Sequence, residues 1–275
     1  MTSAIEQLIK MHDPHCVSIE SLNIGRGRAT LTKEQIVGAF ATCQHRHPVG
    51  FDILMTKYRN DCKAEQRLRS AISVWLHRRP HPARAIAACQ LALNIVLARH
   101  LPAQIEQIAA LLLRYGTRTK ISRKVVEAHK QHIKLLERDK AQALNDDTIA
   151  VLSSDIKTLQ AKIKTERGAL RAWAHQQAVV TQVCPRCHGA GKTLRPHPEI
   201  CNECDGSGRI PPTMGHLHKS MGIIGAEIPL GEWGTQYVPL VQECVQWLYA
   251  EESEAADAIK RRMGEERGEC YGNIR

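Results

Sequence analysis

Apolar residues recur at helical spacing through the first 115 residues of the chain. Each of five segments carries an apolar stripe among polar residues, which is the pattern of an amphipathic helix. Prolines at positions 80 and 82 interrupt the pattern, because proline lacks a backbone donor and restricts the residue before it. No segment before residue 180 alternates as a strand would, so the sequence predicts a mainly α-helical fold with a helical domain over 1–120. The five predicted helices lie near 30–45, 50–61, 63–79, 83–99 and 101–115.

Residues 121–180 show a different, longer repeat. Their apolar positions follow alternating steps of three and four over three heptads, with Glu166 as a polar interruption. A weaker apolar series precedes them, and the polar stretch LNDD at 144–147 separates the two. The pattern predicts an antiparallel coiled-coil hairpin that would offer a surface to a protein partner; the alternative is a long helix packed on the core. The two series are Val126, Ile133 and Leu136, then Ile149, Leu152, Ile156, Leu159, Ile163, Leu170 and Trp173.

Four of the ten cysteines form two Cys-x-x-Cys pairs, and thirteen residues separate the pairs. Zn²⁺ prefers four sulfur or nitrogen ligands at tetrahedral corners, and a Cys-x-x-Cys pair places two thiolates on one side of the ion. A glycine turn follows each pair, where backbone amides can point at the sulfurs. The spacing therefore predicts a closed, structural Zn²⁺ site within a knot over 181–212. Its expected ligands are Cys184, Cys187, Cys201 and Cys204.

Other chemistry at these cysteines matches the sequence less well. A thioredoxin-type redox pair needs an adjacent strand–helix unit, which the pattern does not provide. Four thiolates can also hold an iron–sulfur cluster, although the symmetry of the two turns favours zinc. His188 and His197 lie inside the loop and could replace a cysteine, but with four cysteines present we expect both to be exposed. The other six cysteines are scattered singly and indicate no disulfide framework.

Residues 213–275 have the order of a helix-turn-helix unit. A short helix is predicted over Thr213–Met221, a glycine-rich turn follows, and a second helix starts near Thr235. Pro239 is expected in the first turn of that second helix, where a missing donor costs least. The helix then continues into an acidic stretch, and one of its faces holds Leu240, Cys244, Trp247 and Leu248. A unit of this order can place its second helix in the major groove of DNA.

Charge and composition narrow the choice of partner. The formal net charge is +10, which favours a polyanion such as nucleic acid, although residues 223–275 carry ten acidic side chains against five basic ones. Aromatic residues are 4% of the chain, too few for a protein that binds mainly by stacking bases. The chain start shows no secretory leader and the most apolar stretch, 85–98, is too short to cross a membrane. We therefore expect a cytoplasmic protein with no membrane partner.

The sequence offers no recognisable catalytic constellation. It contains neither a Walker loop, nor a dinucleotide-binding glycine motif, nor a His-Glu-x-x-His pair. A zinc-containing nuclease or primase would need carboxylates gathered around magnesium, and the densest acidic group, at 251–257, is better explained as the solvated face of one helix. We therefore expect a protein that is not an enzyme. An adaptor that binds protein but not DNA is one alternative, and a metal-dependent nucleic-acid enzyme is a more remote one.

Residues 184–259 resemble the late-gene antitermination proteins of lambdoid bacteriophages, the lambda-type Q family. The resemblance rests on the stretches CPRCHGAGK, CNECDGSGRIPPTM and EWGTQYVPLVQECVQWLYAEESEAADAI. Upstream, LTKEQIVGAFATCQHRHPVGFDILMTKY is similar in style to the helical N-terminal part of such proteins, whereas the 122–176 segment looks like added material. The resemblance implies a regulator in a bacterial host cell that binds double-stranded DNA at a phage late promoter. It also implies that the regulator engages the host RNA polymerase holding sigma factor and makes it pass terminators.

The helix-turn-helix prediction nominates the DNA contacts Arg209, Lys219, Thr235, Gln236 and Tyr237. Arg209 and Lys219 are expected to meet phosphates through their positive charge. The other three would stand at the start of the second helix, where amides favour phosphate and side chains reach base edges. Gln236 could pair with N6 and N7 of an adenine. The alternative for Tyr237 is packing inside the unit beside Trp233, and self-association stays open.

Overall fold

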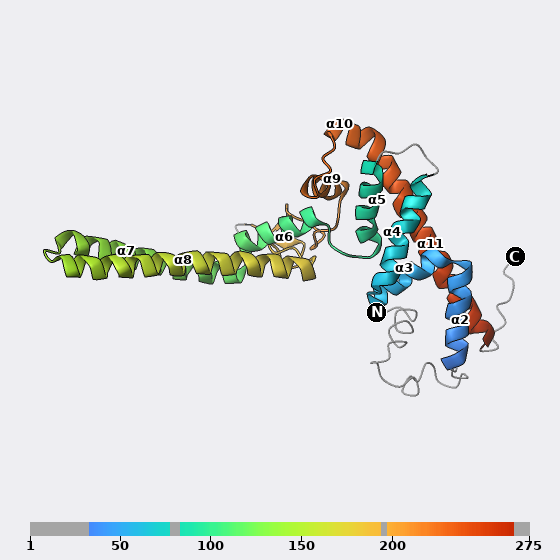
Figure 1. Cartoon of the computed structure of the whole chain (residues 1–275), viewed down its shortest axis with the longest axis horizontal. Helices are drawn as coiled ribbons and strands as arrows, with labels where there is room; N and C mark the ends of the chain where they lie inside the picture. Colours follow the sequence, from blue (N-terminus) through green and yellow to red (C-terminus); the bar gives the residue numbers. More distant parts are fainter. Residues whose placement is uncertain (1–32, 78–82, 194–196, 267–275) are drawn as a thin grey trace. The chain divides into compact units, whose positions relative to one another are not determined.

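The computed structural model describes residues 33–77, 83–193 and 197–266, and the predictions for the two chain ends lie outside these residues. The described chain is mainly helical, as the sequence predicts (Figure 1). The strands among the described residues are β1 (Lys192–Thr193) and β2 (Glu199–Ile200), which pair antiparallel. The chain folds as two compact units. The first consists of the described residues up to Leu101 and from Leu217 onward, and the second is Pro102–His216.

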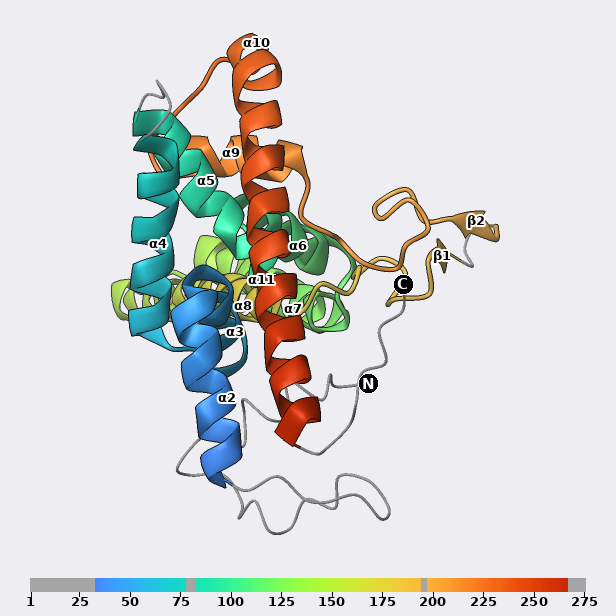
Figure 2. The ribbon, with the colours of Figure 1, turned by 90° about the vertical axis from the view of Figure 1, so that its right-hand side faces the viewer.

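The first unit is built from two stretches that are far apart in the sequence. Its early helices are α2 (Lys33–Arg46), α3 (Pro48–Arg59), α4 (Cys62–His77) and α5 (Ala83–Val96). Its late elements are α9 (Met214–Ile223), within which the unit boundary falls, then α10 (Leu230–Glu232), the π-helix η2 (Trp233–Tyr237) and α11 (Val238–Glu266). The long α11 packs against α2, α3 and α5, so the end of the chain completes a core begun near its start (Figure 2).

The apolar face of α11 follows from its sequence. Leu240, Cys244 and Leu248 are buried, which confirms the face expected for this helix. Trp247, on the same side, is partly buried and stacks on Trp75 of α4, with ring centroids 5.3 Å apart and planes 3° from parallel. The same spacing continues to the end of the helix, where the buried residues are Ala255, Ile259 and Met263. These last residues share a core cluster with residues of α2 and α3, including Phe40, Phe51 and Leu54.

The start of the last helical run differs from the prediction. Helix α11 begins at Val238, so Pro239 lies in its first turn as expected, but α10 and η2 run directly into it from Leu230, and Pro239 therefore also lies inside a longer helical run. Inside a regular α-helix, the proline ring would clash with the carbonyl of the residue four positions earlier. That carbonyl would also lack a hydrogen-bond donor, because proline has no backbone N–H. The π-helical turn η2 absorbs this conflict, because the Val238 N–H bonds to the Trp233 carbonyl with a five-residue step.

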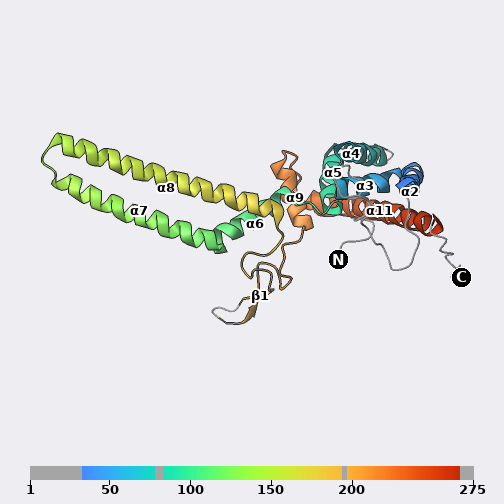
Figure 3. The same ribbon diagram turned by 90° about the horizontal axis from the view of Figure 1, so that it is seen from below.

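The second unit contains α6 (Pro102–Tyr115), α7 (Thr117–Gln142), α8 (Asp146–Val180) and the two cysteine pairs. Helices α7 and α8 run side by side in opposite directions (Figures 1 and 3). The predicted polar turn between them is present, and the side chain of Asn145 accepts a hydrogen bond from the Asp147 amide to cap α8. The prediction of two antiparallel helices is therefore confirmed. Residues buried between them include Val126, Ile156, Leu159 and Ile163.

The compact units divide the chain at other points than the predicted limits near 120, 180 and 212. Helix α6 belongs with the cysteine pairs and α8, because its buried Ile108 and Leu111 pack in the same cluster as Ala178 and the four cysteines. The amphipathic pattern shows which face of α6 is buried but not which partner buries it. Among the described helices, none is both long and apolar enough to pass through a membrane.

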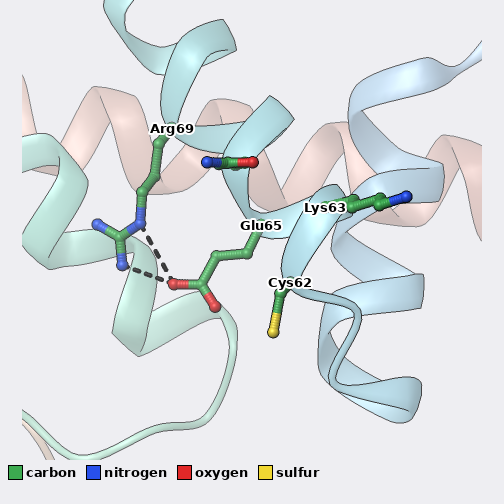
Figure 4. A pocket seen from close by; sticks show the side chains of 5 residues that line it. Cys62, Lys63, Glu65 and Arg69 are labelled. Atoms are coloured by element: carbon green, nitrogen blue, oxygen red, sulfur yellow. Dashed lines mark hydrogen bonds and ion pairs between the residues drawn. The ribbon is translucent and has the colours of Figure 1, made fainter.

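A hollow of about 350 Å³ lies at the start of α4, lined by Cys62, Lys63, Glu65, Gln66 and Arg69 (Figure 4). The Glu65 carboxylate accepts hydrogen bonds from the Arg69 guanidinium at 2.6 Å and the Arg99 guanidinium at 2.7 Å. Hydrogen bonds from Arg99 and then Arg69 lower the pKa of Glu65 below its ordinary 4.5. This acid is therefore a charged structural group that ties α4 to the end of the α5 segment.

We expect Glu65→Gln to destabilise the first unit by about 1 kcal/mol at neutral pH, since its partners are partly exposed. A lowered folded-state pKa stabilises the folded chain above the unfolded value and loses that contribution as pH falls through the folded value. The difference in the free energy of unfolding between wild type and variant should therefore shrink below about pH 4.5. Urea unfolding at neutral and acid pH measures it, with the exposed Glu227→Gln as control. A difference that stays constant with pH would contradict the role given to the ion pairs.

Candidate metal centre

Four buried cysteine sulfurs meet at one point in the second unit. Cys184 Sγ lies 3.8 Å from Cys201 Sγ, and Cys187 Sγ lies 3.7 Å from Cys204 Sγ. All four sulfurs lie within 4.8 Å of one another. Thiolates about 2.3 Å from a tetrahedrally coordinated ion are about 3.8 Å apart, whereas a disulfide bond is about 2 Å long. The four thiols are free, and their spacing is that of a site for a single metal ion.

The two cysteine pairs are related by an internal repeat of seventeen residues. The first cysteine of each pair donates its backbone N–H to the last glycine of the other loop: Cys184 to Gly208 at 2.9 Å, and Cys201 to Gly191 at 3.0 Å. Both glycines have positive φ, +71° for Gly191 and +73° for Gly208. A Cβ at Gly191 would lie 2.2 Å from the Gly206 carbonyl oxygen, and one at Gly208 would lie 2.3 Å from the Gly189 carbonyl oxygen. The loops thus cross too closely for any residue but glycine.

Backbone amides of the turns point at the sulfurs. Burial raises the pKa of the Cys184 thiol to about 12. Burial also acts to raise the pKa of Cys187, but hydrogen bonds from the Gly191 and Gly189 amides and from neighbouring thiols outweigh it, so this pKa is lowered. Amide donors of this kind stabilise thiolates, the form that binds metal. The arrangement supplies the secondary contacts of a thiolate–metal site from the backbone itself.

The cysteine cluster is packed into the helices rather than exposed at the end of a loop. Its sulfurs share an apolar cluster with Ile108 and Leu111 of α6 and Ala178 of α8. The buried Gln104 side chain of α6 donates to the Ile210 carbonyl at 2.7 Å, just after the second pair. A site closed in this way leaves no side for a substrate, which is typical of structural metal centres.

Glu203 joins the second loop to the end of α6. Its carboxylate accepts a hydrogen bond from the Tyr115 hydroxyl at 3.1 Å and lies 3.7 Å from the Arg186 guanidinium, which belongs to the first loop. The Arg186 guanidinium also lies over the Tyr115 ring, 5.7 Å from its centroid. Sequence reasoning did not identify Gln104, Glu203 or Tyr115, because their spacing carries no motif; they are recognisable once α6 is seen to pack here.

The two histidines considered as replacement ligands stand outside the cluster. His188 and His197 are both exposed, and the metal-ligating group found among the described residues consists of cysteines. His188 has a φ of +50° and Asp205, seventeen residues later, has +46°, so both occupy the same turn position in the repeat.

The five nominated DNA contacts do not share one environment. Arg209 belongs to the second unit, where it pairs with Val183 in an isolated β-bridge, whereas the other four belong to the first unit. Lys219, Thr235 and Gln236 are exposed, although the Thr235 hydroxyl donates to the Gly231 carbonyl at 3.0 Å. Tyr237 is 2% exposed and its ring stacks on Trp233. Its ring therefore packs inside the unit, which is the alternative considered for it, and it is not presented to DNA.

Trp233 and Tyr237 form the centre of the turn region together with His218 of α9. The His218 ring packs against the Trp233 ring, with centroids 5.2 Å apart, and His218 Nε2 hydrogen-bonds to the Ile228 carbonyl at 2.7 Å. This packing fixes α9 to the start of the last helical run, so the exposed Lys219, Thr235 and Gln236 have a rigid base.

We expect Cys201→Ala to abolish metal binding and loosen the packing of α6, because a structural metal contributes its binding free energy to folding. The metal content after dialysis should fall from about one ion per chain, which is the stoichiometry of a four-cysteine site, to nearly none. The exposed Cys62→Ala is the matched control and should leave the metal content unchanged. Equal metal content in wild type and the Cys201 variant would rule the site out.

Gly191→Ala should weaken metal retention without removing a ligand. The variant combines a left-handed backbone, which costs a non-glycine residue roughly 1–2 kcal/mol, with a clash against the opposite loop. Gly168→Ala in α8, where a Cβ meets nothing within 4 Å, is the control and should be neutral or stabilising. Competition with a chelator measures the effect. Indistinguishable metal release from the two variants would show that the crossing of the loops does not matter.

A family model matches almost the whole chain. It is described as conserved hypothetical protein CHP02642 and covers residues 2–268, which include both cysteine pairs and all the described helices. No curated protein and no solved structure matches the chain. On the extent of that match, this chain belongs to the family of conserved hypothetical protein CHP02642.

Proposed function

We propose that this protein is a zinc-containing, DNA-binding regulator of transcription antitermination. The observation that carries the proposal is the junction after the cysteine cluster. There the stretch that resembles the lambda-type Q family, 184–259, runs from the metal centre through α9 into the last helical run. Its exposed polar residues stand on a base fixed by buried aromatic packing.

Zinc is the metal that fits this centre best. Four thiolates in a closed tetrahedron with amide donors to sulfur form the usual structural Zn²⁺ site. When bound, the ion would hold the two loops together and supply no chemistry of its own. Cys184, Cys187, Cys201 and Cys204 would be its ligands.

Helix α9 and the helical run from Leu230 form the proposed helix-turn-helix unit. Lys219 lies on the exposed side of α9, and Thr235 and Gln236 lie exposed in the π-helical turn. Lys219 would neutralise a phosphate, and Gln236 would hydrogen-bond a base edge. With Tyr237 buried, the proposed base contacts reduce to Thr235 and Gln236.

The second partner in this proposal is the host RNA polymerase holding sigma factor, as the family resemblance implies. The α7–α8 hairpin, as an antiparallel coiled coil, is a candidate surface for a protein partner. The proposed site of action is the cytoplasm of a bacterial host cell. The rival functions give different results in solution: an adaptor binds polymerase without DNA, and a nuclease cleaves DNA when magnesium is added.

The proposal is tested by transcription in vitro from a phage late promoter with a downstream terminator. Added protein should increase read-through of the terminator, and footprinting should reveal a protected promoter site. Read-through without a protected site would indicate an adaptor, and the absence of both would contradict the proposal.

Two variants test the proposed DNA contacts. Lys219→Gln should weaken binding to all sequences and reduce the salt dependence by about one unit, because one phosphate contact is lost. Gln236→Ala should relax preference at one base pair, by roughly 1–3 kcal/mol. Lys260→Gln, an exposed lysine near the far end of α11, is the control. If all three variants give the same footprint as wild type, these residues do not contact DNA.

A further inference from the structure

The charges of the α7–α8 hairpin are separated along its length. Its half near α6 consists of residues 117–134 and 157–175, which we call the shaft, and carries eleven Lys and Arg against two Glu. Its other half, residues 135–156, carries two Lys and Arg against five Asp and Glu. The shaft is therefore much more basic than the chain around it.

The shaft cations are exposed and largely free of acidic partners. All eleven side chains are exposed. Among the described residues, the one salt bridge these eleven make joins Lys130 Nζ to Glu127 Oε2 at 3.7 Å. Arg118 lies over the Trp173 ring, 5.3 Å from its centroid, and Arg123 donates a hydrogen bond to the Leu113 carbonyl at 3.3 Å. Most of the other like charges have no acidic partner and repel one another, so a binding role accounts for them better than stability does.

Several of the cations gather at one groove. A hollow of about 480 Å³ between the two helices is lined by Arg123, Lys124 and Lys130 of α7 and by Arg167 of α8, with Glu127 as its one acidic side chain. Helical spacing places Lys120 and Lys134 on the same side of α7, and Lys164 and Arg171 on the same side of α8 as Arg167. The positive charge thus continues along the helices on both sides of the groove.

We propose that the shaft binds the phosphate backbone of duplex nucleic acid without reading its sequence. From Lys120 to Lys134 the row of cations is about 21 Å long at the rise of an α-helix. A straight, rigid row of that length fits a duplex, whose phosphates are evenly spaced along a stiff rod, better than a flexible single strand. Lysine is depleted at protein–protein interfaces, so an acidic protein is the less suitable partner.

This inference goes beyond the proposed function and stands without it. The shaft belongs to the second unit, whereas Lys219, Thr235 and Gln236 belong to the first.

The experiment measures binding of the full chain to a short duplex of arbitrary sequence by fluorescence anisotropy, between about 50 and 200 mM salt. The shaft variant is Arg123→Gln, Lys124→Gln, Lys130→Gln and Arg167→Gln. The control variant removes four exposed cations of the first unit by Arg46→Gln, Lys63→Gln, Lys260→Gln and Arg261→Gln. Circular dichroism and metal content establish that each variant is folded.

The shaft variant should bind the duplex at least about tenfold more weakly, with a salt slope reduced by about three to four units, because up to four phosphate contacts are lost. The control variant should bind nearly as wild type does. A variant in which each Arg of the four shaft positions is replaced by Lys, and each Lys by Arg, should retain binding, because a phosphate contact depends on the positive charge. Because the duplex has an arbitrary sequence, its binding does not depend on a promoter site, so the result is distinguishable from failure of the proposed function.

Four outcomes would overturn the inference. If the wild-type protein does not bind the duplex at low salt, the inference is wrong. Equal weakening of the shaft and control variants means that only the overall charge matters. Tighter binding to a single strand than to the duplex contradicts the fit to a rigid rod. Unchanged duplex binding by the folded shaft variant would leave the surface to an acidic protein partner.

Discussion

The second unit depends on the contact between four buried sulfurs and the helices around them. Its long helices pair with each other, but the apolar residues that join α6, α8 and the loops are few, and they surround the cysteines. A small cluster of this size rarely holds a fold by itself, and metal coordination is a common way to add the missing stability. The same cluster fixes the chain that follows, because Gln104 binds the Ile210 carbonyl directly after the second pair.

Much of this architecture can be predicted from the sequence, because it depends on local patterns. The amphipathic segments, the polar turn of the hairpin and the gathering of four cysteines follow from periodicity and spacing. What the sequence did not reveal depends on tertiary packing. The amphipathic pattern of α6 does not predict that its apolar face packs against the cysteines. The sequence of residues Trp233–Tyr237 likewise does not predict a π-helical turn next to Pro239. Tyr237 shows the limit most clearly, since its position near a helix start suggested exposure and its ring is buried.

The molecule uses charge in two opposite ways. In the first unit a buried Asp52 is held by two hydrogen bonds from Arg67, at 2.8 and 2.5 Å, and Glu65 is held by two arginines. Charges paired in this way fix helices to one another and are satisfied within the fold. Along the shaft of the hairpin the cations face solvent with one carboxylate pair among them. That contrast separates groups that maintain structure from groups that remain available to a ligand.

The discontinuous first unit has a consequence for how the chain folds as it is made. Helices α2 to α5 end at Val96, but α11, which packs against three of α2 to α5, begins at Val238. During synthesis the second unit is complete at His216, before the ribosome has produced the helix that the first unit needs. Domains fold as units when their residues become available, so the inserted unit should fold first and the enclosing unit last. Until then the apolar faces of α2, α3 and α5 stay uncovered, and the nascent chain is most prone to aggregation or chaperone binding during this interval.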